Sequence, residues 1–75
     1  MSQEPIPVAT VDTPSRARPV CRREFCSGFG SHTADAITRI SAVGNDMGAS
    51  EIIGVRLSPT ARGQVVAYGT AIWYA

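Results

Sequence analysis

Residues 34–75 constrain the fold of this 75-residue chain more than any other part of its sequence. Their first half carries apolar side chains at spacings of four, three and four: Ala36, Ile40, Val43 and Met47. This period predicts an amphipathic helix, and Gly48 favours the left-handed backbone that ends one. Their second half predicts two strands separated by a polar loop. The last strand, from Gln64 to about Trp73, is apolar on both faces and therefore needs cover on both sides.

Alternating side chains earlier in the chain predict one more strand, over residues 20–26. A glycine-rich turn is expected over residues 27–31, and either Ser31 or Thr33 is expected to cap the helix. We therefore predict an α+β fold of β-α-β-β order, in which a small antiparallel sheet carries one helix on one face.

Prolines interrupt the first part of the chain at positions 5, 7 and 14. Because proline removes a backbone donor and no apolar period is sustained there, residues 1–18 are predicted to form a flexible tail. A single small domain is expected over residues 19–75. The alternative is that Ile6, Val8 and Val11 dock part of this tail as an edge strand.

One helix can cover only one face of a three-stranded sheet. The last strand places Val65 and Trp73 on one face, and Tyr68, Ile72 and Tyr74 on the other. The set that faces away from the helix would form an apolar patch, and such patches usually mark an interface. We therefore expect a homo-oligomer that forms through these residues, by sheet stacking or edge pairing. The alternative is that the N-terminal segment folds back over the second face.

The net charge is +1, and all seven basic residues are arginines. So small a charge creates no long-range field for nucleic acid or an anionic membrane. Arg16, Arg18, Arg22 and Arg23 form a loose basic cluster, either a solvated segment or a contact for an anionic partner. No array of base-stacking aromatic residues accompanies it, so we expect a protein partner rather than nucleic acid. No apolar run is long enough to cross a membrane.

Cys21, Cys26 and His32 are the only cysteine and histidine residues of the chain. Structural zinc takes four ligands, so no metal site is expected within one chain. The cysteines either stay free or close a small disulfide loop. No nucleophile, base and orienter fall into a recognisable pattern, so we expect no catalytic residues, no cofactor and no enzymatic activity. Asp46 and Glu51 are expected to face solvent.

Three short motifs carry a resemblance: Met47-Gly48-Ala49 at the helix end, Ile53-Gly54-Val55 in a strand, and Gly69-Thr70-Ala71 in the last strand. Together they resemble the YbjQ-type family of small bacterial α+β proteins, which are described as heavy-metal-binding and form ring-like homo-oligomers. The outline is also similar to the BhsA-type periplasmic stress proteins. The resemblance covers residues 34–75. It implies a β-α-β-β scaffold that oligomerises, and it carries over no metal or catalytic residue.

These observations favour a small non-enzymatic binding or assembly module that self-associates through its sheet. One alternative is a phage or mobile-element inhibitor of a host protein, such as an anti-CRISPR. Another is an exported or lipid-anchored envelope stress protein, which would fit a Cys21–Cys26 disulfide. The first residues lack a signal-peptide pattern, so we expect a cytoplasmic location, or a periplasmic one if Met1 replaces a removed signal.

Overall fold

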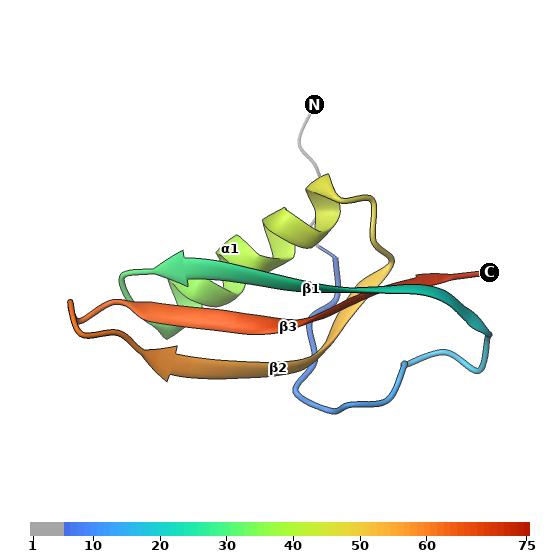
Figure 1. Cartoon of the computed structure of the whole chain (residues 1–75), viewed down its shortest axis with the longest axis horizontal. Coiled ribbons are helices and arrows are strands. Elements are labelled where there is room, and N and C mark those ends of the chain that lie inside the picture. Colours follow the sequence, from blue (N-terminus) through green and yellow to red (C-terminus); the bar gives the residue numbers. More distant parts are fainter. Residues whose placement is uncertain (1–5) are drawn as a thin grey trace.

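The computed structural model describes residues 6–75, which form one three-stranded antiparallel sheet with one helix packed on it (Figure 1). The elements are β1 (Val20–Gly30), α1 (Thr33–Asp46), β2 (Glu51–Pro59) and β3 (Val65–Tyr74). The strand order in the sheet is β1-β3-β2, so the last strand of the chain is the central one. The predicted α+β class and β-α-β-β order are confirmed.

Helix α1 lies on one face of the sheet and buries Ala36 and Ile40 against it, as the apolar period predicts. Its N-cap is His32, so the prediction of Ser31 or Thr33 is wrong. The His32 backbone is extended, and its Nδ1 accepts a hydrogen bond from the Asp35 N–H (3.3 Å). In return, the Asp35 carboxylate accepts a hydrogen bond from the Ser31 N–H (3.0 Å). Together these contacts satisfy backbone donors at and just before the start of the helix.

The expected turn over residues 27–31 is absent, because β1 continues to Gly30. Gly28 and Gly30 instead let the helix lie close to the sheet. A Cβ atom on Gly28 would stand 2.7 Å from the Ile40 backbone nitrogen, and one on Gly30 would be closer still to the backbone of Ala36. Glycine is therefore required in this strand by packing rather than by a turn.

Residues 6–18, here called the N-terminal arm, contact the rest of the chain. Val8 forms a parallel bridge with Ile52 of β2, and the Ile52 N–H donates to the Pro7 carbonyl (3.0 Å). Gly54 has a φ of +64° and donates its N–H to the Val11 carbonyl (2.7 Å). Residues 7–11 thus dock against β2 through this isolated bridge and its neighbouring backbone hydrogen bonds, as the alternative to a flexible tail expected, but they form no full strand (Figure 1, blue). The part of the predicted tail before residue 6 lies outside the described residues.

Candidate interaction face of the sheet

The sheet face opposite α1, here called the second face, is organised in four cross-strand rows. Cys26 and Gly28 face the helix, so their neighbours along β1 point to the second face. The rows run from β1 through β3 to β2: Arg23–Ile72–Glu51, Phe25–Thr70–Ile53, Ser27–Tyr68–Arg56 and Phe29–Val66–Ser58. The first two rows contain the buried side chains Ile72, Glu51 and Ile53. The last two rows contain none, and we call their end of the face the open end.

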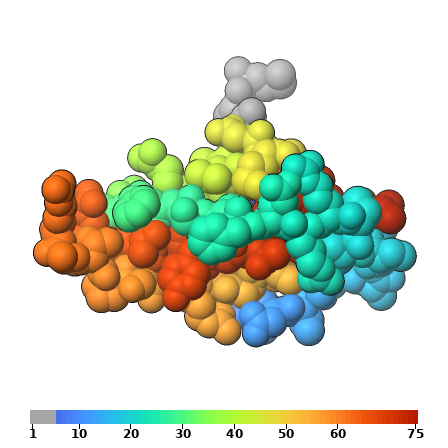
Figure 2. All heavy atoms as spheres, in the orientation of Figure 1, coloured from blue at the N-terminus to red at the C-terminus, as the bar shows by residue number. Residues whose placement is uncertain are grey.

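Three exposed aromatic side chains gather toward the open end, and we call Phe25, Tyr68 and Phe29 the aromatic patch. Their exposed fractions are 72%, 37% and 56%. Tyr68 pairs with the small Ser27, and Phe25 and Phe29 occupy the two diagonal positions, which lie within reach of an aromatic ring. Figure 2 shows this face, with the atoms of β1 and β3 side by side at its front. Contiguous exposed apolar surface of this kind marks interaction sites.

The other end of the second face is covered. Ile72 is fully buried and Ile53 is 3% exposed. Glu51 is also only 3% exposed, so the prediction that it faces solvent is wrong. Its carboxylate can be buried because it accepts hydrogen bonds from other parts of the chain. Ser15 donates from its hydroxyl (2.7 Å) and its N–H (3.3 Å), and the Tyr74 hydroxyl donates to the same carboxylate. Asp46 is exposed, as predicted.

Burial by itself would raise the pKa of the Glu51 carboxyl. The hydrogen bonds from Tyr74 and Ser15, with the charge of Arg16, outweigh burial and hold that pKa below its usual value of 4.5. Glu51 is therefore ionised at neutral pH. As a charged acceptor it joins the N-terminal arm to β2 and β3.

The four arginines of the predicted basic cluster separate into three places. Arg16 and Arg18 lie over the Tyr74 ring, 5.6 and 5.9 Å from its centroid. Arg22 lies 4.4 Å from the Trp73 ring centroid and pairs with Glu24. Arg23 stands in the same row as Ile72. The four arginines therefore do not form one cluster, and their contact with an anionic partner stays a prediction.

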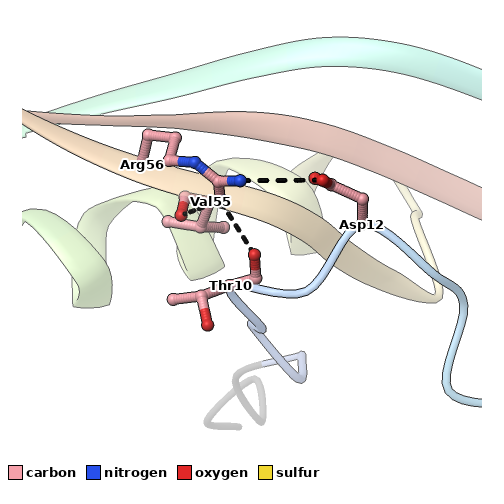
Figure 3. A network of polar contacts seen from close by, with 4 residues as sticks. All are labelled: Thr10, Asp12, Val55 and Arg56. Carbon is pink, nitrogen blue, oxygen red and sulfur yellow. Dashed lines mark hydrogen bonds and ion pairs between the residues drawn. The ribbon is translucent and has the colours of Figure 1, made fainter.

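A second group of polar contacts ties the N-terminal arm to β2 (Figure 3). Arg56 of β2 donates to the Thr10 carbonyl (2.8 Å) and to the Val55 carbonyl (3.1 Å), and lies 3.6 Å from the Asp12 carboxylate. Arg56 is the cross-strand neighbour of Tyr68. Its guanidinium is turned toward the arm, so the arm anchors the charged side chain that stands opposite Tyr68.

The five predicted interface residues do not share one surface. Ile72 is fully buried, so its assignment to an exposed interface is wrong. Trp73 and Val65 are partly buried and pack against the core on the helix side, away from the second face, and their role in an interface stays a prediction. Tyr74 is half-buried and engaged with Glu51 and the arm. Only Tyr68 lies at the open end of the second face.

Sequence reasoning missed Phe25 and Phe29 as members of this surface. The signal was present in the alternation of Phe25, Ser27 and Phe29 with Cys26, Gly28 and Gly30. A strand that continues past Cys26 places both phenylalanines on one face. Because a turn was expected over residues 27–31, the strand was predicted to end at Cys26, and an aromatic array on the sheet was not predicted.

The cysteines do not pair within one chain. Both are free, with Cys21 exposed and Cys26 buried. They lie five positions apart in one extended strand, about 16 Å, which is beyond the reach of a disulfide. Burial raises the pKa of the Cys26 thiol, although a hydrogen bond with the Ala71 backbone partly offsets it. Among residues 6–75 no three His, Cys, Asp or Glu side chains are grouped to hold a metal ion.

No protein-family model matches the chain, and comparisons with curated proteins and with solved structures gave no match. The resemblance to the YbjQ-type and BhsA-type families therefore stays a prediction. No helix within residues 6–75 is long and apolar enough to cross a membrane.

Proposed function

We propose that this protein is a small non-enzymatic binding module that self-associates through the aromatic patch. The observation that carries the proposal is the exposure of Phe25, Tyr68 and Phe29 on neighbouring rows of one sheet face. Folding leaves most of Phe25 and Phe29 and about a third of Tyr68 in water, although aromatic side chains can bury about 150–250 Å² each. A partner that covers them gains the free energy that the monomer leaves unused.

Charge favours a second copy of the chain as that partner. Phe25, Ser27, Phe29, Tyr68 and Val66 include no acidic or basic side chain, so two patches can meet without repulsion between like charges. Arg56, the nearest cation along the central rows, is turned to the N-terminal arm. The net charge of +1 adds little repulsion between two copies. Arg23 is exposed on the same face, but it stands in the row of Ile72 and Glu51 and not between the aromatic rings.

The size of the patch sets the expected strength of association. Three partly exposed aromatic residues bury a few hundred Å² per copy, less than the roughly 800 Å² per partner of standard interfaces. We therefore expect a weak dimer with a dissociation constant on the order of 10–100 μM, equivalent to about −5 to −7 kcal/mol.

Sedimentation equilibrium over a wide concentration range tests the proposal. Phe25→Ser is expected to weaken association at least tenfold, and Phe25→Ser with Phe29→Ser to abolish it. Ile37→Ser is the matched control, because it removes a comparable exposed apolar side chain from α1. A wild-type chain that stays monomeric at several hundred micromolar would contradict the proposal. So would an equal effect of the Ile37→Ser control.

A further inference from the structure

The mode of self-association depends on which parts of the sheet a second copy can reach. Strand β3 is central, and the N-terminal arm pairs with the outer edge of β2. Within residues 6–75, the outer edge of β1 carries no pairing strand. Two routes therefore exist for a second copy: pairing along the β1 edge, or packing against the second face.

Helix α1 obstructs the β1 edge. The would-be Cβ of Gly28 lies 2.7 Å from the Ile40 nitrogen, so the helix sits directly on this strand. A helix is about 10 Å wide and neighbouring strands are about 4.8 Å apart. The helix consequently overhangs the edge, and Figure 1 shows α1 crossing behind β1 and reaching past it.

Antiparallel pairing of two β1 strands near Ser27 would bring two such helices together on the same side of a continuous sheet. Their axes would lie closer than the 8–10 Å that packed helices require. Pairing centred nearer the start of β1 avoids the helices but places Arg23 opposite its own symmetry mate. Like charges in directly opposed positions destabilise a strand pair, and charged side chains protect sheet edges.

The second face has no such obstruction at its open end. We infer that two copies pack face to face through the aromatic patch, with their helices on the two outer sides, which specifies the self-association proposed above and rests on it. Face-to-face sheets lie about 10 Å apart, a gap that interdigitated aromatic side chains fill. Ser15 and Arg16 of the arm reach Glu51 and Tyr74 at the covered end, so the two sheets overlap only through their open ends.

Thiol-labelling rates distinguish the two routes. Val66→Cys places a thiol on the central strand in the patch row of Phe29, where face packing covers it and edge pairing leaves it open. The background carries Cys21→Ser, since Cys21 is exposed and Cys26 is buried. Thr38→Cys, on the exposed side of α1, is the control. Each variant is labelled with iodoacetamide at dilute and at high concentration, and sedimentation gives the dimer fraction of the same samples.

Face packing predicts that labelling of Val66→Cys slows roughly tenfold when nine-tenths of the chain is dimeric, while Thr38→Cys is unchanged. If the chain dimerises and the Val66→Cys rate does not change, the face-packing inference is overturned and the proposed self-association stands. If neither Val66→Cys nor the wild-type chain dimerises at any concentration, the proposed function itself fails. If only Val66→Cys fails to dimerise, Thr70→Cys replaces it on the same strand and face and decides between the two routes.

Discussion

The two ends of the second sheet face differ in exposure: the N-terminal arm contacts one end, and the other end is open to solvent. At the covered end, the N-terminal arm pairs with β2 and its Ser15 hydrogen bonds to the buried Glu51. At the open end, Phe25 and Phe29 remain largely exposed on an edge strand. Both ends belong to the same three strands and both are rich in apolar residues. What differs is whether the chain supplies a segment to cover them.

This difference separates folding from interaction. Side chains that the arm covers contribute to the stability of one copy. Exposed side chains contribute little to that stability and are available to a second copy. Substitutions at the two ends should therefore affect different measurements, and the following predictions use that contrast.

The largest expected effect is on stability at the covered end. Ile72→Ala removes a fully buried side chain and should lower the free energy of unfolding by about 2–5 kcal/mol. Phe25→Ala, at the open end, should change it by no more than about 0.5 kcal/mol. Urea unfolding at dilute concentration, where the chain is monomeric, measures both. Equal losses of unfolding free energy in the two variants would contradict the proposed difference between the two ends.

The next effect concerns the attachment of the arm. Glu51→Gln removes a charged acceptor for Ser15 and Tyr74 and should weaken arm docking by about 1–2 kcal/mol. Trypsin cleavage after Arg16 reports on this docking and should accelerate roughly tenfold through local opening. Asp46→Asn removes an exposed carboxylate instead and should leave the cleavage rate unchanged. Unaltered cleavage in Glu51→Gln would show that this carboxylate does not hold the arm.

The pH dependence of stability follows from the same group. The pKa of Glu51 is lower in the folded chain than its usual value of 4.5, so the unfolded chain binds more protons in this range. The stabilisation by Glu51 is thus fully present well above pH 4.5 and is lost as the pH falls through the folded pKa.

Urea unfolding of the wild type and of Glu51→Gln at several pH values isolates this contribution. The pKa of Asp35 is also lowered, by hydrogen bonds from the Ser31 backbone and side chain, but it titrates in both proteins and cancels in the difference. The stability difference between the two proteins should shrink as the pH is lowered from 6 to 3. A difference that stays constant over this range would contradict the role of the Glu51 charge.

The smallest expected effect is on nucleic acid. The structure shows an aromatic array that the sequence reading lacked, so stacking surface is present on the second face. Single-strand binding also needs a run of cations along the same surface. Arg16 and Arg18 lie over Tyr74 at the covered end. Arg56 is turned to the N-terminal arm, which leaves Arg23 as a single cation beside Phe25. A labelled oligothymidine should show no change in fluorescence polarisation. Binding that weakens with salt and is lost in Phe25→Ser would show instead that the patch binds nucleic acid.

The sequence predicts the parts of this fold that local pattern determines. The apolar period of α1, its end before Gly48 and the two strands that follow are visible in the spacing of side chains. The turn predicted at Gly28 and Gly30 is wrong because glycine suits turns and close contacts between backbones equally well. Only the three-dimensional approach of Ile40 and Ala36 distinguishes these two uses.

The candidate site was less predictable because it depends on which segment covers which face. Alternation along β3 separates Trp73 from Tyr68 but does not say which of them meets the helix. Ile72 is buried next to Glu51, and the arm binds Glu51 and Tyr74 through contacts between residues far apart in the chain. Such long-range pairing leaves no periodic signal in the sequence.

The central claim is that a second copy meets this chain at the open end of the second face. Chemical shifts of the backbone amides and aromatic rings, recorded as the protein is diluted, test it residue by residue. The account predicts concentration-dependent shifts at Phe25, Phe29 and Tyr68, and none at Ser15 or Glu51. Shifts confined to the covered end, or absent at every concentration, would contradict it.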